Sequence, residues 1–453
     1  MSFLKKLFGK SSPRVVVIGL DGTPYTFLQR MVQEGHMPTF DRITRDAGFV
    51  RMNSVYPTVS SVAWSSYMTG VNPARHGIFG FIDRKPGSYE TTIPTSRRMT
   101  ATTLWETLSQ AGKQVIVMNV PVTYPPREVK GILIGGFLSP KIERAVYPPE
   151  KAGLIQSLGY RIDTDAWLAR ESKDKLFGDV LDCLERREKT LLHLMDHEPW
   201  DFFQCHIMET DRLYHFSWEQ YATDDPQYAP RFYEVIHRID DLLGKVLERV
   251  EKTGAELMVL SDHGFCTLKY EVYVNTWLAQ KGWLTLPDPR PERIQLKDVG
   301  PTSQVYSLDP GRVFLNLEGR EPGGKIPLDE YEPWLERIAQ AAMAELVDPE
   351  TGEPMLEKVL RRDEIYHGPG LERAADLILV PRYGYDLKGA FGKDQLTFKG
   401  DALVGMHTYD DAMISVRNRP IAGSDFSIVD ATATVFELMG VEPPPDLDSR
   451  SLV

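Results

Sequence analysis

Short runs dominated by apolar residues alternate along the chain with amphipathic stretches. The first run, Val15–Leu20, is rich in β-branched residues and ends at Asp21-Gly22. Runs of this kind predict strands that are buried on both faces of a parallel sheet. We expect such strands at residues 14–20, 114–120, 132–135, 201–208, 255–260 and 412–416.

Stretches with helical periodicity separate these runs. Their apolar residues recur every three or four positions, which predicts helices with one buried face. The expected helices lie at residues 24–34, 172–197, 228–252, 331–346 and 428–439. Because strands alternate with helices, we predict an α/β fold whose mostly parallel sheet carries helices on both faces.

The pattern changes after about Phe265. Residues 285–325 are rich in Pro, Gly and charge, a strand is expected at 312–317, and the α/β pattern returns in the last 60 residues. We therefore predict a core made of residues 13–265 and 401–453. An inserted α+β cap would occupy residues 266–400, and residues 1–12 would form a flexible leader.

Composition narrows the possible partners. The 453 residues include 52 Lys and Arg against 64 Asp and Glu, a net charge of −12. This balance argues against nucleic-acid binding, which needs basic side chains to replace counterions on phosphates. A small phosphorylated substrate, if the chain binds one, would have to be held by something other than the overall charge, and metal ions are the obvious candidates. The oligomeric state stays open.

Cysteine content and the start of the chain indicate the compartment. Cys183, Cys205 and Cys266 show no CxxC spacing, so we expect no disulfide framework and a cytoplasmic location. Residues 1–10 mix apolar and basic side chains without the apolar core of a signal peptide. We expect at most weak membrane contact there, and no run approaches the roughly 20 residues that cross a bilayer.

Three carboxylates follow predicted strands. Asp21, Asp211 and Asp262 each lie shortly after such a strand. Ligands of open α/β sheets bind at the carboxyl ends of the strands, so these side chains are candidates to converge. His263 follows Asp262 directly, and His215 lies four residues after Asp211, on the same face of a helical turn.

A hydroxyl cluster lies at residues 56–70. We expect a strand that breaks at Pro57 into a Ser/Thr-rich segment and then a helix. Ser60 and Ser61 at the start of that helix have an ordinary interpretation as capping residues. The same position also faces an anion with backbone N–H groups, and a hydroxyl held between two divalent cations loses its proton near neutral pH.

Taken together, these segments resemble the alkaline phosphatase superfamily, and within it the type I phosphodiesterase and nucleotide pyrophosphatase branch with its predicted phosphohydrolase/phosphomutase relatives. The segments that carry the resemblance are Gly19–Gly22, Pro57–Ser60, Asn72–Ile78, Asp211–His215, Ser261–Gly264 and Gly405–His407. The resemblance implies an alkaline-phosphatase-like core and a two-metal phosphoester hydrolase, either a phosphodiesterase or a phosphatase.

The resemblance also implies a role for each residue. Ser60 would be the nucleophile that forms a phosphoseryl intermediate, and it would bridge both metals. One metal would be held by Asp211, His215 and His407, and the other by Asp21, Asp262 and His263. The two divalent ions would be Zn²⁺, with Mn²⁺ or Fe as alternatives, because the ligands are oxygen and nitrogen atoms without thiolates.

Some features depart from the family pattern. Phe79-Gly80-Phe81 occupies the stretch where nucleotide-cleaving members carry an Asn, which argues against a nucleotide diester. The segment 60–64 lacks the sulfatase motif. Phosphoglycerate mutases insert a large segment soon after the nucleophile, whereas the long insertion here follows His263. A phosphomutase and a non-catalytic binding protein on the same core are the alternatives.

Other polar residues carry weaker indications. We interpret His206 as a satisfied core histidine and His76 as a structural residue. Arg75, Arg84 and Lys85 are candidates for phosphate binding, although basic residues in loops are ordinarily solvated.

Overall fold

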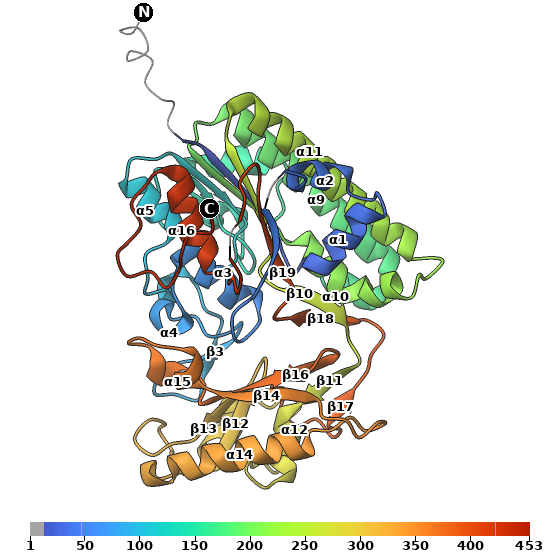
Figure 1. Ribbon diagram of the computed structural model, residues 1–453. Helices are drawn as coiled ribbons and strands as arrows, with labels where there is room; N and C mark the ends of the chain where they lie inside the picture. The colour runs from blue at the N-terminus through green and yellow to red at the C-terminus, as the bar shows by residue number, and fades with distance from the viewer. Residues whose placement is uncertain (1–12, 47, 422) are drawn as a thin grey trace, which may run out of the picture.

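The computed structural model describes residues 13–46, 48–421 and 423–453, and its centre is an eight-stranded sheet (Figure 1). In order across the sheet, the strands are β2 (Gly48–Met52), β19 (Ala412–Val416), β9 (Glu256–Leu260), β1 (Val15–Leu20), β8 (Phe202–Ile207), β5 (Val115–Met118), β6 (Gly131–Ile134) and β7 (Val146–Tyr147). The five strands from β9 to β6 are parallel. Strand β19 runs antiparallel to both of its neighbours, β2 and β9, and the edge strand β7 runs antiparallel to β6.

Alternate residues of the central strands enter two different cores. In β1, Val16, Ile18 and Leu20 belong to one core, whereas Val15 and Val17 belong to the other. All five side chains are buried, because helices cover both faces of the sheet. This arrangement explains why the strand has no polar alternation.

Helices flank the sheet on both sides (Figure 1). The first face is covered mainly by α1 (Tyr25–Gln33), α2 (Pro38–Thr44), α9 (Lys173–His197), α10 (Glu209–Ala222) and α11 (Ala229–Thr253). The second face is covered mainly by α3 (Ser60–Thr69), α5 (Leu104–Gln110) and α16 (Asp430–Met439).

A smaller α+β body lies below one end of the central sheet in Figure 1. Its four-stranded sheet consists of β12 (Val305–Leu308), β13 (Arg312–Leu315), β15 (Leu377–Pro381) and β14 (Leu356–Arg361). A second sheet consists of β16 (Tyr385–Lys388), β11 (Tyr270–Tyr273) and β17 (Thr397–Phe398). The helices α12 (Val274–Gln280) and α14 (Tyr331–Glu345) pack on these sheets around a separate apolar core.

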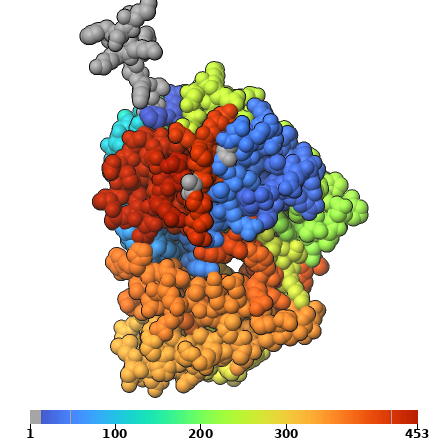
Figure 2. Space-filling view, viewed as in Figure 1, coloured from blue at the N-terminus to red at the C-terminus, as the bar shows by residue number. Residues whose placement is uncertain are grey.

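The smaller body is joined to the larger one by more than its two chain connections. Tyr89 packs in the apolar core of the smaller body, and Arg84 forms an ion pair with the buried Glu321. Between the two bodies, β10 (Gly264–Thr267) pairs with β18 (Gly405–Thr408) in antiparallel fashion. Figure 2 shows an opening along the seam between them.

The predicted α/β class with a mostly parallel, doubly covered sheet is confirmed. The predicted strands correspond to β1, β5, β6, β8, β9, β13 and β19, and the predicted helices to α1, α9, α11, α14 and α16. The strand expected up to Pro57 is wrong. The strand in that region, β2, ends at Met52, and an irregular segment with a cis Tyr56-Pro57 bond leads to α3.

Further expectations concern whole regions of the chain and the cysteines. The cap sheets lie between Tyr270 and Phe398, inside the predicted insertion, whose boundaries stay a prediction. The predicted leader and its membrane contact lie outside the described residues. Among the described residues, no helix combines the length and the apolarity needed to cross a bilayer. Cys183, Cys205 and Cys266 are all free cysteines.

Candidate active site

The candidate ligands meet at one edge of the central sheet because of the strand order. Strands β8, β1 and β9 are parallel neighbours, so their carboxyl ends lie side by side. Asp21 follows β1 directly, Asp211 lies in the first turn of α10 after β8, and Asp262 and His263 follow β9. His407 reaches the same place on β18, where it pairs with Phe265 of β10.

The first group of side chains consists of Asp211, His215 and His407. Nε2 of His407 lies 2.9 Å from Nε2 of His215 and 3.2 Å from Oδ1 of Asp211. Nε2 of His215 lies 3.3 Å from the same carboxylate oxygen. These atoms are close enough together to bind one metal ion.

The second group surrounds Ser60, the first residue of α3. Its Oγ lies 3.1 Å from Oδ1 of Asp21 and 3.2 Å from Nε2 of His263. Nε2 of His263 also lies 3.3 Å from Oδ2 of Asp262. Ligand atoms of Asp21, Asp211 and His263 lie within 4.8 Å of one another, so the two groups adjoin.

All three histidines have the orientation of metal ligands. Each Nδ1 faces a backbone carbonyl oxygen, which can only accept a hydrogen bond. The distances are 3.1 Å from His215 to Gly405, 3.0 Å from His263 to Gly264 and 3.2 Å from His407 to Thr58. Each Nδ1 therefore carries the proton and donates it, which leaves the Nε2 lone pair facing the centre of the site.

Burial and charge at the site fit bound cations. Burial lowers the pKa of His263 to about 3 and that of His215 to about 4, so both rings are neutral at pH 7. Oδ2 of Asp262 is buried and has no hydrogen-bond partner among the described residues. Burial, together with the nearby Asp21 carboxylate, raises the pKa of Asp262 well above its usual range. A divalent cation would give Oδ2 of Asp262 a partner and would offset the repulsion between the Asp262 and Asp21 carboxylates. The residues present therefore fit a metal centre.

A family model described as type I phosphodiesterase / nucleotide pyrophosphatase matches residues 15–410. The chain belongs to this family. Membership confirms the resemblance seen in the sequence, including its place in the alkaline phosphatase superfamily, and makes the protein a hydrolase of phosphoric ester bonds. No match was found among curated protein sequences.

Solved structures agree with this family at the level of the fold. Phosphonoacetate hydrolase from Sinorhizobium meliloti 1021, in complex with phosphonoformate, is 19% identical with a TM-score of 0.65, and the match covers 95% of each chain. An inactive variant of murine ectonucleotide pyrophosphatase / phosphodiesterase 5, in complex with AMP, is 16% identical with a TM-score of 0.59 and 96% coverage of each chain. The human protein of that name is 16% identical with a TM-score of 0.57, covering 95% of this chain and 96% of that chain.

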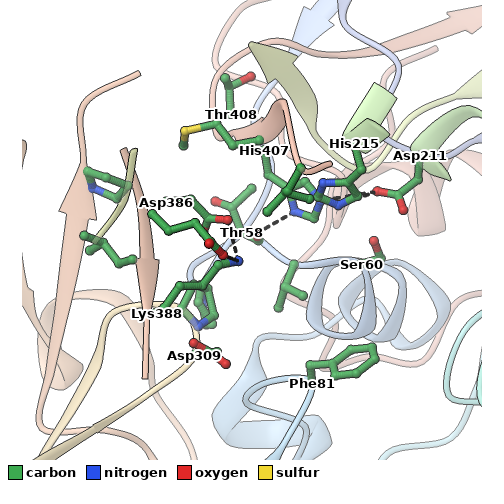
Figure 3. Close-up of a pocket in the computed structure, with 18 of the residues that line it drawn as sticks. Thr58, Ser60, Phe81, Asp211, His215, Asp309, Asp386, Lys388, His407 and Thr408 are labelled. Carbon is green, nitrogen blue, oxygen red and sulfur yellow. Dashed lines mark hydrogen bonds and ion pairs between the residues drawn. The ribbon is translucent and has the colours of Figure 1, made fainter. Parts of the chain in front are cut away.

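The hydrolase has a cavity of about 1400 Å³ in front of Ser60, between the core and the smaller body. Figure 3 shows Ser60, Asp211, His215 and His407 on the core side and Asp309, Asp386 and Lys388 opposite them. The lining includes eight carboxylate side chains and six Lys or Arg. The protein alone therefore gives this cavity no excess of positive charge, and a phosphate group needs the metal centre.

The basic residues singled out from the sequence are engaged elsewhere. Arg75 pairs with Asp446 and Asp448, Arg84 with Glu321, and Lys85 with Glu90. The cationic side chains in the cavity lining are Arg170, Lys173, Arg212, Lys358, Lys388 and Lys393. Three of these, Lys358, Lys388 and Lys393, come from the smaller body. No local sequence pattern indicates that this body folds over Ser60.

Aromatic side chains form two walls of the cavity. Phe81 lies against Phe137, with ring centroids 5.1 Å apart. Tyr56 and Tyr409 stack in parallel at 4.1 Å. Phe79, by contrast, is buried in a small cluster away from the cavity lining. The segment that replaces the family's Asn thus contributes one apolar side chain to the cavity.

Two other histidines were predicted to be structural. His76 is buried and bonded to Ser66 at 3.0 Å, as expected. His206 is also a buried core residue, as expected, but it is only partly satisfied, because its Nδ1 has no partner among the described residues. Its Nε2 lies 2.6 Å from Oδ2 of Asp21. The one signal in the sequence was its place on the strand that precedes Asp211.

Proposed function

We propose that the chain is a two-metal phosphodiesterase that acts through a phosphoseryl intermediate on Ser60. The observation that carries this proposal is the position of the Ser60 hydroxyl. It lies between Asp21 and His263, and ligand atoms of these two residues lie within 4.8 Å of Asp211 in the neighbouring group. Asp21, Asp262 and His263 would hold one ion and the other group the second. Zn²⁺ is the proposed metal, with Mn²⁺ or Fe as alternatives, because nitrogen and oxygen ligands suit all three.

The residues of the chain support a two-step displacement. Ser60 Oγ, with its proton released to solvent, attacks phosphorus. The Oγ–P bond forms as the bond from phosphorus to the ester oxygen breaks, and the departing alkoxide takes a proton from water. In the first turn of α3, Val62 and Ala63 donate their N–H groups to the Val59 carbonyl. The N–H groups of Ser60 and Ser61 have no partner within the helix and are available to phosphoryl oxygens. Bound divalent cations would stabilise the serine alkoxide and the charge on the leaving oxygen.

The second step returns the serine. Water attacks the phosphorus of phosphoserine, Ser60 Oγ leaves and regains a proton, and the product is released. That product is a phosphomonoester from a diester, or phosphate from a monoester. The wide cavity supports transfer to water over a phosphomutase, which needs a closed and dry site.

The cavity favours a diester with a bulky apolar or aromatic group. Its volume of about 1400 Å³ exceeds what a small phosphomonoester fills. The Phe81 and Tyr56 walls supply apolar surface beside Ser60. The proposed partner is thus a small phosphorylated molecule, with specificity set by the smaller body and the segment after His76.

A substrate panel tests the proposal. Metal-stripped protein, reloaded with Zn²⁺ or Mn²⁺, is assayed with bis(4-nitrophenyl) phosphate and 4-nitrophenyl phosphate, and bound metal is measured by elemental analysis. We expect two metals per chain and a higher kcat/KM for the diester. Fewer than two bound metal ions per chain, together with no turnover of either ester, would overturn the proposal of a two-metal enzyme. A higher kcat/KM for the monoester would overturn the diester preference alone.

A further inference from the structure

The two oxygens of the Asp21 carboxylate have different surroundings. Oδ1 faces the site, 3.1 Å from Ser60 Oγ and 3.5 Å from His263 Nε2. Oδ2 points away from it and accepts two hydrogen bonds, from His206 Nε2 at 2.6 Å and from Trp64 Nε1 at 2.9 Å. Asp21, Trp64 and His206 are all fully buried.

We propose that His206 and Trp64 are positioning residues, which hold Asp21 so that Oδ1 alone is presented to a metal ion. A carboxylate that is free to turn can bind an ion through either oxygen or through both. With Oδ2 held by two donors, its orientation is set before the ion binds, so less conformational freedom is lost on binding. The inference rests on the proposed role of Asp21 as a metal ligand.

The packing around Gly19 holds the rings of Trp64 and His206 in place beside Asp21. In the parallel pair of β1 and β8, Gly19 lies beside His206. Gly19 has no side chain, and the indole ring of Trp64 occupies the space above it. A Cβ atom on Gly19 would lie 2.4 Å from the ring. The rings of Trp64 and His206 meet edge to face, with centroids 4.8 Å apart, so both donors reach Oδ2 from fixed directions.

One feature of His206 lowers the stability of the folded protein. Its Nδ1 is buried without a partner among the described residues, and an unpaired buried polar atom destabilises the folded state. Phenylalanine would fill the same volume without that penalty. Stability and metal affinity should therefore respond differently when His206 is replaced, which separates a positioning role from a purely structural one.

The test measures metal affinity directly. Metal-stripped wild type, His206→Phe and Trp64→Phe are titrated with Zn²⁺ in competition with a fluorescent chelator, and thermal melting is recorded without metal. We expect the affinity for one of the two ions to fall by about 10- to 100-fold in His206→Phe, and the other to stay unchanged. His206→Gln, whose amide can still donate to Oδ2, should recover part of the loss. Trp64→Phe should show a smaller loss at the same ion.

Cys205→Ala is the matched control, because Cys205 precedes His206 on β8 and faces the opposite core. It should lower the melting temperature and leave both affinities intact. Equal affinities in wild type, His206→Phe and Trp64→Phe would overturn the inference. If His206→Phe fails to fold, Trp64→Phe and His206→Gln carry the same test.

Asp21→Asn separates this inference from the proposed function. If Asp21→Asn leaves both Zn²⁺ affinities unchanged, the assignment of Asp21 as a ligand is wrong and the proposed metal centre with it. If Asp21→Asn weakens one ion and the His206 and Trp64 variants do not, the metal centre stands and the positioning role is overturned.

Discussion

Nε2 of His407 lies 2.9 Å from Nε2 of His215, although 192 residues separate the two histidines in sequence. Both rings direct Nδ1 to backbone carbonyl oxygens. The two Nε2 atoms thus face each other beside the Asp211 carboxylate. Burial opposes a charge there, but the Asp211 carboxylate outweighs burial and raises the pKa of His407, so this position favours a cation, either a proton or a metal ion. The pair therefore links the folding of β18 onto α10 to metal binding.

Metal removal should lower the stability of the protein for this reason. An ion that binds the folded state at 100 times its Kd adds about 2.7 kcal/mol to the free energy of unfolding. We expect EDTA followed by desalting to lower Tm in differential scanning calorimetry, and Zn²⁺ to restore it in a concentration-dependent way. Mg²⁺, which disfavours imidazole ligands, serves as the control ion. A Tm that does not respond to Zn²⁺ would contradict the metal centre.

Replacement of Ser60 by alanine should abolish turnover while the metals stay bound. The side chain removed is the proposed nucleophile, so we expect kcat to fall by about 10⁴-fold or more. Elemental analysis should still find close to two ions per chain, because six other ligands remain. Ser61→Ala is the neighbouring control and should keep most of the activity. Full activity of Ser60→Ala would place the nucleophile elsewhere, with Thr58 and Ser61 as the next candidates.

The aromatic wall at Phe81 should affect diesters more than monoesters. Phe81→Ala removes a ring that lines the cavity and packs on Phe137. We expect KM for bis(4-nitrophenyl) phosphate to rise about tenfold, since burial of an aromatic group contributes roughly 1.5–3 kcal/mol. KM for 4-nitrophenyl phosphate should change little if its ring does not reach this wall. An exposed apolar residue, Ile93, provides the control Ile93→Ala. Equal effects on the KM of both esters would contradict the role of Phe81 in binding the second ester group of a diester.

The buried ion pair between Arg187 and Glu209 should be important for stability. Both side chains are almost completely buried, with Nε of Arg187 2.8 Å from Oε1 of Glu209. Arg187→Ala would leave a buried carboxylate without its cation at the start of α10, so we expect a loss of about 3–5 kcal/mol in urea unfolding. Arg186→Ala breaks an exposed pair with Asp182 on the same helix. That control should cost less than about 1 kcal/mol. Similar losses in both variants would contradict the difference in burial.

Local patterns of residues were enough to predict the central elements and the candidate ligands. In residues 14–20 and 228–252, the positions of the apolar residues follow the buried faces of the element. Because this pattern lies within one short segment, β1 and α11 could be predicted from it. The Asp and His residues of the site were found because their spacing within short segments matches a known family. Pro57 misled the strand prediction, because a break in the chain does not show where the preceding strand ends.

Which of these segments come into contact depends on the tertiary fold. Strand order brings Asp21 beside His206, and the pairing of β18 with β10 brings His407 to Asp211 across 196 residues. The cap places Lys388 opposite Ser60 (Figure 3). None of these contacts can be predicted from a local sequence pattern. The spacing of apolar residues indicates which side chains are buried, but it does not indicate which other residues they pack against. For this reason the chemistry could be predicted from the sequence, whereas the contacts that orient Asp21 could not.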